Sequence, residues 1–258
     1  MPIHNEMWAL MQEYIPRKKS KVGRPEHCIR KSLEGIFYVL ETGCQWKHLP
    51  QEYGKKSTVH RKFLELARTG VFKKIHEIFL HHYEEKRGKF GIWYAFDAIS
   101  VKAPLALEKC GKNPTDRGKK GTKRNLIVDQ RGAPYAISIG GANTHDSQFV
   151  EEILKNSTHI FKKEEIKVMA TDSAYDSKKC RTLFKNNGFI LLAAENPRRK
   201  KIENPYRPLH RWIVERTHSW LNNFRSLKIR WSKLEISYQA FCLFAASIQL
   251  FRMSRILG

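Results

Sequence analysis

Three acidic residues have the side-chain type and the setting that divalent-metal chemistry needs. Asp97 lies within an apolar run rich in aromatic and branched residues, where an unpaired charge is costly to bury. Asp172 follows a second short apolar run, and Glu215 is the one acid within residues 209–228. Carboxylates that face one cleft repel each other unless cations neutralise them, and hard oxygen ligands favour Mg²⁺ or Mn²⁺ over zinc. Two such ions about 3.5–4 Å apart stabilise an in-line phosphoryl displacement.

Residues 209–228 divide into two faces when they are plotted at helical spacing. The polar face comprises Arg211, Glu215, His218, Asn222 and Arg225, and the opposite face comprises Ile213, Thr217, Trp220, Phe224 and Leu227. Taken alone, this helix is more typical of an amphipathic surface helix with a solvated charged face. Glu215 becomes a stronger candidate for a metal ligand when it is considered together with Asp97 and Asp172.

The elements around these acids predict an α/β domain over residues 91–258. Strands are expected at 91–103, 125–130, 134–140, 165–170 and 188–195, with the second and third joined as a hairpin. Helices are expected after Asp146 and Asp176, each read as an N-cap, and again at 209–228 and 236–256. Asp172 then stands at the carboxyl end of a strand, where open α/β sheets place their chemistry. The last helix is mostly apolar and is expected to pack against the sheet or a second subunit.

Residues 1–90 predict a smaller, all-helical domain. Helical periods cover residues 6–15, 26–41 and 71–87, and Ser57 and Thr58 cap another helix with His60, Arg61 and Lys62 near its start. A helix, a turn and a second helix that begins with basic residues form the helix-turn-helix pattern, whose second helix enters the major groove. An ordinary small helical bundle has the same periodicity, and the basic surplus favours the DNA-binding interpretation.

The charge balance predicts a polyanionic partner. The 48 Lys and Arg residues outnumber the 25 Asp and Glu residues, which gives a formal charge of +23 and makes nucleic acid the leading candidate. The GRP segment that contains Arg24 can lie along a minor groove or a phosphate backbone, although a plain basic loop is an equal alternative. The loop 104–124 could clamp phosphates or be a solvated loop, and its candidate contacts are Arg117, Lys119, Lys120, Lys123 and Arg124.

Compartment and thiol chemistry can also be predicted. No apolar run reaches the roughly 18 residues of a membrane span, and the first residues lack a charged-then-apolar signal pattern. We therefore expect a cytoplasmic protein with no membrane contact. The five cysteines are scattered and have no C-x-x-C spacing, which argues against a disulfide framework and a zinc site.

Several motifs resemble the DDE transposases of bacterial insertion sequences, in the insertion-sequence-five family. In the second half these are FDAISVKAP, GKNPTDRGKKGTKRNLIVDQRGAP, GANTHDS, ATDSAYDS and HRWIVERTHSWLNNFRSL. In the first half, the segments GRP, TGCQWKHLP and STVHRKF resemble that family's small helical DNA-binding domain. The resemblance covers nearly the whole chain. It implies an RNase H-like mixed sheet flanked by helices, preceded by a helix-turn-helix-like domain.

The same resemblance implies a catalytic role for the three acids. Asp97 would bridge two Mg²⁺ or Mn²⁺ ions, while Asp172 and Glu215 would each hold one. Water would cut the transposon end to leave a 3′-hydroxyl, which would then attack a target phosphodiester. The implied partners are double-stranded DNA, both terminal inverted repeats and target, and further copies of the chain in a homodimer or larger synaptic oligomer.

The basic positions around Glu215 depart in part from the broader family's Y-R-E-K signature. Arg211 matches the arginine, but Pro208 occupies the tyrosine position and Asn222 the lysine position. Arg225 and Lys228 are further candidates for the cation that contacts the end DNA.

Two rival functions stay open on the sequence. A non-catalytic DNA-binding protein would need no metal ligands, so acids at all three positions count against it. A metal-dependent nuclease that never joins ends would use the same acids. A tyrosine recombinase is disfavoured because Tyr94 and Tyr175 have no surrounding set of arginines and histidines.

Overall fold

A computed structural model describes residues 2–17, 27–88, 92–145, 147–157, 159–161, 165–194 and 211–255. The chain forms two compact units. The helical unit comprises Met1–Arg87 with Leu221–Gly258, and the sheet unit comprises Gly88–Trp220. The predicted boundary near residue 90 lies close to the start of the sheet unit, but the last segment of the chain groups with the N-terminal helices. No helix in the described segments has both the length and the apolar character to cross a membrane.

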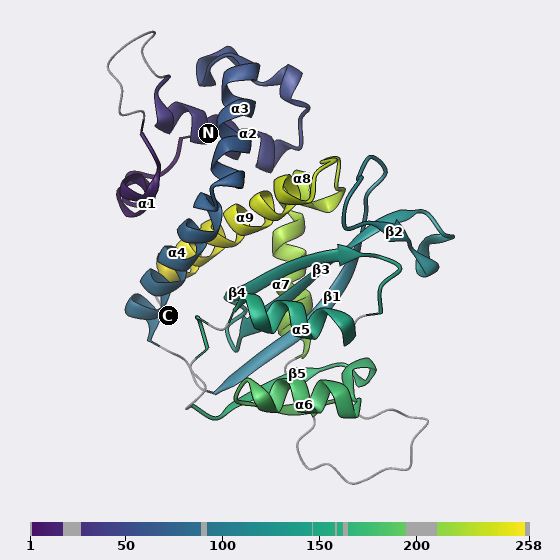
Figure 1. Ribbon diagram of the computed structural model, residues 1–258. Coiled ribbons are helices and arrows are strands. Elements are labelled where there is room, and N and C mark those ends of the chain that lie inside the picture. The colour runs from purple at the N-terminus through teal and green to yellow at the C-terminus, as the bar shows by residue number, and fades with distance from the viewer. Residues whose placement is uncertain are drawn as a thin grey trace. The chain divides into compact units, whose positions relative to one another are not determined.

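The helical unit is built around its final helix (Figure 1). Its helices are α1 (Asn5–Met11), α2 (Ile29–Thr42), α3 (Lys56–Arg68), α4 (Val71–Arg87), α8 (Arg225–Lys228) and α9 (Glu235–Arg255). Phe244 of α9 is fully buried, and its ring centroid lies 5.5 Å from that of Phe72. Phe241 stacks on Phe63 at 4.5 Å. The apolar last helix therefore packs against α4 and α3 of its own unit, a partner that the sequence analysis did not name.

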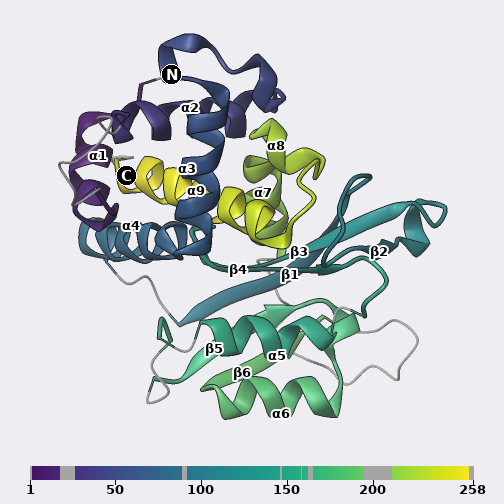
Figure 2. The same cartoon turned by 45° about the horizontal axis from the view of Figure 1, so that its top comes forward.

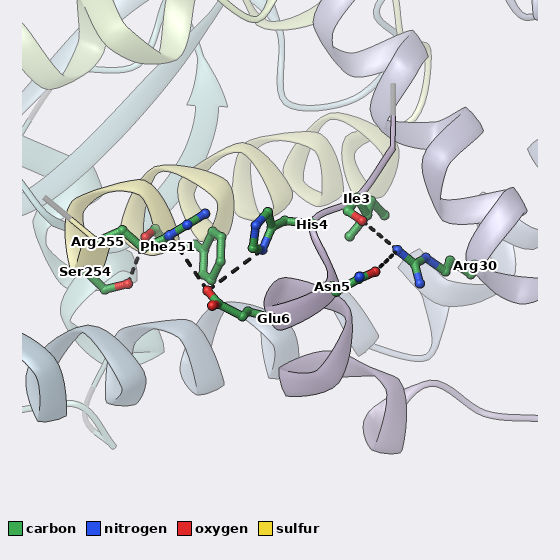
Figure 3. A network of polar contacts seen from close by, with 8 residues as sticks. All are labelled: Ile3, His4, Asn5, Glu6, Arg30, Phe251, Ser254 and Arg255. Atoms are coloured by element: carbon green, nitrogen blue, oxygen red, sulfur yellow. Dashed lines mark hydrogen bonds and ion pairs between the residues drawn. The ribbon is translucent and has the colours of Figure 1, made fainter.

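The N-terminal segment is tied to this unit at two places (Figure 3). Arg30 of α2 donates to the carbonyl of Ile3 at 2.8 Å and to Asn5 Oδ1 at 2.7 Å. Arg255 of α9 lies 3.7 Å from the Glu6 carboxylate. These contacts hold the start of the chain to both α2 and α9.

The sheet unit is a six-stranded mixed sheet flanked by helices, which confirms the predicted α/β class. Its strands are β1 (Trp93–Lys102), β2 (Gly111–Lys112), β3 (Lys120–Asp129), β4 (Pro134–Gly141), β5 (Lys167–Thr171) and β6 (Phe189–Ala193). The order is β2-β3-β1-β5-β6, with β4 also paired to β3. β1, β2 and β4 run antiparallel to β3, whereas β1, β5 and β6 are mutually parallel. β2 lies in the region expected to be a loop.

Helices cover both faces of this sheet. Figure 2 shows α5 (Ser147–Asn156) and α6 (Lys178–Asn186) on one face and α7 (Arg211–Asn222) on the other. The expected hairpin is present as β3 and β4, and Thr217 of α7 bonds to its turn at Gly132. The hairpin therefore supports the helix that carries Glu215.

Three local predictions need correction or lie outside the description. The single helix expected over 209–228 is broken: α7 ends at Asn222, and α8 starts at Arg225 after Phe224 turns extended (φ −75°, ψ 104°) and becomes buried. Asp176 is not the N-cap of α6, because Ser177 caps it by accepting from the Cys180 amide, while Asp176 pairs with Arg181 at 2.6 Å. Asp146 lies outside the described residues.

We expect Phe244→Ala to destabilise the helical unit by about 3–5 kcal/mol, because a large side chain is removed from a closed core. Urea unfolding followed by hydrogen exchange should show the loss of protection in α4. The matched control is Leu107→Ala, because Leu107 is 69% exposed and its truncation should change stability by less than about 0.5 kcal/mol. Equal losses in the two variants would contradict this packing.

Candidate active site

Two of the three candidate acids lie at the same level on neighbouring parallel strands, Asp97 within β1 and Asp172 directly after β5. β1 and β5 pair in a register that runs from Trp93↔Val168 to Ala95↔Ala170. Asp97 and Asp172 each stand two residues beyond the last of these pairs, and Asp172 keeps an extended backbone (φ −71°, ψ 162°). Because side chains alternate along a strand, both carboxylates project from the same face of the sheet.

That face is the one on which α7 packs. Phe96 points to the opposite face, where its ring lies 4.9 Å from Tyr175 and 6.3 Å from Phe184 of α6. Its neighbour Asp97 must therefore point toward α7. The sheet thus presents two half-buried carboxylates to the helix that bears the third acid.

Each aspartate is also held by the backbone that follows it. Asp97 Oδ1 accepts from the Ala98 amide at 2.8 Å, and Asp172 Oδ1 accepts from the Ser173 amide at 2.6 Å. The Asp172 bond caps the short 3-10 helix Ser173–Tyr175. These two bonds orient the side chains, and each of them uses the Oδ1 oxygen of its carboxylate.

Glu215 lies on the exposed side of α7. The helix is anchored to the hairpin because Thr217 Oγ1 donates to the Gly132 carbonyl at 2.8 Å and Arg216 Nη2 donates to the Arg131 carbonyl at 2.8 Å. Gly132 has φ +87°, and a Cβ there would lie 2.7 Å from Thr217 Oγ1. Both the turn and the close approach of the helix therefore require glycine at this position.

A buried polar cluster joins α7 to the middle of the sheet. Arg124 of β3 is 0% exposed and His218 of α7 is 2% exposed. Arg124 Nε donates to His218 Nδ1 at 3.4 Å, and Arg124 Nη2 donates to the His218 carbonyl at 3.2 Å. His218 Nε2 lies 3.4 Å from the Asp97 carbonyl oxygen. Burial and the nearby guanidinium lower the pKa of His218 well below its ordinary value, while the Asp97 carbonyl opposes this shift.

This cluster corrects one prediction and reveals residues that the sequence analysis missed. Arg124, expected to contact DNA, is buried in the sheet unit. The signal was available in the alternation of β3, because Arg124 lies on the same face as the buried Thr122 and Leu126. His218, read as part of a polar surface stripe, instead faces the sheet.

The chemistry of the donor set fits a hard divalent cation, but the three acids do not form a ready-made metal cluster. Within the described residues, no three His, Cys, Asp or Glu side chains are grouped closely enough to hold a metal ion. The register of β1 and β5 thus sets Asp97 and Asp172 on one face of the sheet, and Glu215 lies on α7, which packs on that face.

A cationic cleft lies within the helical unit. Its volume is about 1170 Å³, and its basic lining residues are Arg17, Lys47, Lys55, Lys56, Arg61 and Lys62. Arg61 and Lys62 were predicted DNA contacts and come from α3. His60, predicted with them, is half-buried, its ring centroid lies 4.8 Å from that of Trp46 in a tilted arrangement, and burial lowers its pKa. Residues 43–55 connect α2 and α3 through two 3-10 turns, a longer connection than the roughly three- to four-residue turn of a helix-turn-helix motif.

The other predicted DNA contacts are scattered over both units. Arg117, Lys119 and Lys120 are exposed, and Lys123 is half-buried with Nζ donating to the Thr144 carbonyl at 2.9 Å. In the helical unit, Asn222 is half-buried, while Arg225 and Lys228 are exposed. Arg24 and the side chain of Arg211 lie outside the described residues.

Comparisons with known proteins converge on one family. Residues 90–250 match the family model "Transposase DDE domain", and residues 3–76 match "Putative transposase of IS4/5 family". The chain is 31% identical over 138 residues to the "Putative transposase for insertion sequence element IS402" of Burkholderia cepacia, an alignment that spans 52% of this chain and 64% of that protein. It is also 31% identical over 118 residues to a 16.2 kDa uncharacterized protein of the same element, spanning 43% of this chain and 80% of that protein.

A solved structure supports the fold. The chain is similar to the piggyBac transposase in a synaptic complex with hairpin DNA, with a TM-score of 0.50, 10% identity, and coverage of 97% of this chain and 73% of that one. At this identity the likeness shows the fold alone, which agrees with the RNase H-like arrangement that the family resemblance implies.

We expect Thr217→Val to destabilise the sheet unit by about 1–2 kcal/mol, because the buried Gly132 carbonyl loses its donor. The measurement is the free energy of unfolding, assigned to the sheet unit by hydrogen exchange of β3 and β4. Thr182→Val is the matched control, since exposed Thr182 bonds to the Lys178 carbonyl of its own helix, and this variant should change the free energy of unfolding by less than about 0.5 kcal/mol. Unchanged stability of Thr217→Val would rule out this anchoring role.

Proposed function

Because the chain belongs to the DDE transposases of insertion sequences, we propose that it is a DNA transposase that cuts the ends of its element and joins them to target DNA. The observation that carries this proposal is the register of β1 and β5, which sets Asp97 and Asp172 on one face of neighbouring parallel strands. Asp172 directly follows β5, and Asp97 lies within β1 just beyond the part that pairs with β5. The carboxyl ends of parallel strands are where α/β sheets commonly place their catalytic groups.

Asp97, Asp172 and Glu215 are the proposed ligands of Mg²⁺ or Mn²⁺, with two ions in each site. When bound, the ions would polarise the scissile phosphate and make water a stronger nucleophile. The two aspartates orient their oxygens through the bonds from Ala98 and Ser173. Glu215 comes from α7, so the site closes only when this helix is correctly docked.

The proposed reaction has two steps. In the first, hydrolysis of a phosphodiester at the transposon end consumes one water and leaves a 3′-hydroxyl. In the second, that hydroxyl attacks a target phosphodiester, so that one bond forms as another breaks and the target strand leaves with its own 3′-hydroxyl. No covalent bond to the protein is involved.

The proposed partners are double-stranded DNA and further copies of the chain. The cationic cleft has the charge to bind a phosphate backbone, and α3 brings Arg61 and Lys62 to it. Holding two transposon ends together calls for a homodimer or a larger synaptic oligomer. A protein that acts in this way on a bacterial chromosome would work in the cytoplasm, at the nucleoid.

We expect Asp97→Asn, Asp172→Asn and Glu215→Gln each to reduce cleavage by about 10²–10³-fold or more, because each removes charge stabilisation from the transition state. Binding of end DNA should remain. The substrate is a duplex that carries the short inverted repeats flanking the coding region, assayed with Mg²⁺ for both cleavage and strand transfer.

Asp176→Asn is the matched control, because this acid follows Asp172 by four residues but pairs with Arg181. It should cut normally. Full cutting by any of the three site variants would refute that residue's assignment. DNA binding without cutting by the wild-type chain would favour a non-catalytic DNA-binding protein, and cutting without joining would favour a plain nuclease.

We expect the double variant Lys56→Ala, Arg61→Ala to bind duplex DNA more weakly and with a smaller salt dependence. Each lost phosphate contact should lower the slope of log affinity against log salt by about 0.9. Fluorescence anisotropy over a salt series measures this slope. Lys73→Ala is the control, because Lys73 is exposed on α4 outside the cleft, and an equal effect in that variant would contradict specific binding in the cleft.

A further inference from the structure

His218 links α7 to two strands of the sheet through opposite edges of one ring. Its Nδ1 accepts from Arg124 of β3, and its Nε2 faces the Asp97 carbonyl of β1. We propose that Arg124 and His218 form a positioning latch, which fixes α7 on β1 and thereby sets the distance of Glu215 from Asp97 and Asp172. The effect on the three acids rests on the function proposed above, whereas the contacts of the latch do not.

The bonding pattern specifies one tautomer of His218. Arginine has only donors, so Nδ1 must carry the lone pair that accepts from the Arg124 guanidinium. The proton of the neutral ring is then on Nε2, where it can be donated to the Asp97 carbonyl oxygen. A phenylalanine would fill the same space but could make neither bond. The two bonds therefore hold the ring to both strands in a defined orientation, which packing of its volume alone would not do.

The latch lies one helical turn from Glu215. Residues three apart on a helix have Cβ atoms about 5–6 Å apart on the same side. Any rotation or slide of α7 over the sheet would move Glu215 and the His218 ring together. The bonds of the latch are long, at 3.2–3.4 Å, so we expect their main effect to be on the position of Glu215 and not on the stability of the fold. A misplacement of about 1 Å can reduce catalysis about a hundredfold.

Three substitutions at His218 separate the two edges of the ring. Glutamine can place an amide donor near the Nε2 position and so retain the bond to Asp97. Asparagine can place an amide oxygen near the Nδ1 position and retain the bond from Arg124. Phenylalanine retains only the volume. His76→Gln, at a buried histidine of the helical unit, is the matched control.

The test is Mn²⁺ binding to the full-length chain, measured from the free Mn²⁺ signal in electron paramagnetic resonance, together with the melting temperature. We expect Asp97→Asn to lose binding. His218→Phe and His218→Asn should weaken binding about 10–100-fold, the range found for groups that orient metal ligands. His218→Gln should bind closest to wild type, and His76→Gln should bind as wild type does.

The melting temperatures decide between a latch and simple packing. The latch predicts that the affinities of the asparagine and glutamine variants differ although their melting temperatures match. If all three His218 variants lose affinity only in proportion to lost stability, the residue merely packs and the latch is overturned. If Asp97→Asn loses binding while every His218 variant retains it, the latch fails and the carboxylate site stands. If Asp97→Asn binds as tightly as wild type, the proposed site fails and the latch's effect on it fails too.

A second readout needs no metal. Long-range ¹⁵N–¹H correlation spectra of histidine-labelled protein distinguish the two neutral tautomers. We expect one Nε2-protonated resonance that disappears in His218→Gln and becomes a tautomer mixture in Arg124→Leu. An Nδ1-protonated ring in the wild-type chain would overturn the bonding pattern.

Discussion

A buried guanidinium must find acceptors, and this requirement shapes the functional face of the sheet unit. Arg124 is fully enclosed between β3 and α7, where a cation without hydrogen-bond partners would be strongly destabilising. The imidazole and carbonyl of His218 accept from its Nε and Nη2, and the same imidazole reaches β1 at Asp97. Segments far apart in the sequence are thus brought together by one charge that cannot reach water.

The three acids are not positioned by equally rigid means. Asp97 and Asp172 are set by the backbone pairing of parallel strands, whose register cannot slip without moving every side chain to the other face. Glu215 stands on a helix that side chains and one hairpin turn hold to the sheet. The position of Glu215 therefore depends on how α7 docks, whereas the positions of the two aspartates depend on strand register.

Periodicity predicted the sheet strands except the two-residue β2, and it placed Asp97 within a strand and Asp172 at the end of one. The pattern could not predict what the last helix packs against. A helix that is apolar on all sides is expected to be buried, but its sequence does not indicate which element covers it. The break after Asn222 was missed because Phe224 continues the helical pattern in sequence while its burial requires an extended backbone. Arg124 was assigned to DNA because its charge was counted with the loop cations and its inward position in the β3 alternation was not considered.

The placement of charge separates binding from chemistry. Surface acids such as Glu152 and Asp176 pair with Lys109 and Arg181, and exposed pairs of this kind contribute at most about 1 kcal/mol each. Asp97 and Asp172 differ because they project from one half-buried face of the sheet, where the proposed divalent cation would offset two negative charges. Six cations line the cleft of the helical unit, and the sheet unit has exposed cations of its own, among them Arg117, Lys119 and Lys120. A polyanion can therefore meet cations on either unit, while the sheet face that carries Asp97 and Asp172 has two acids side by side.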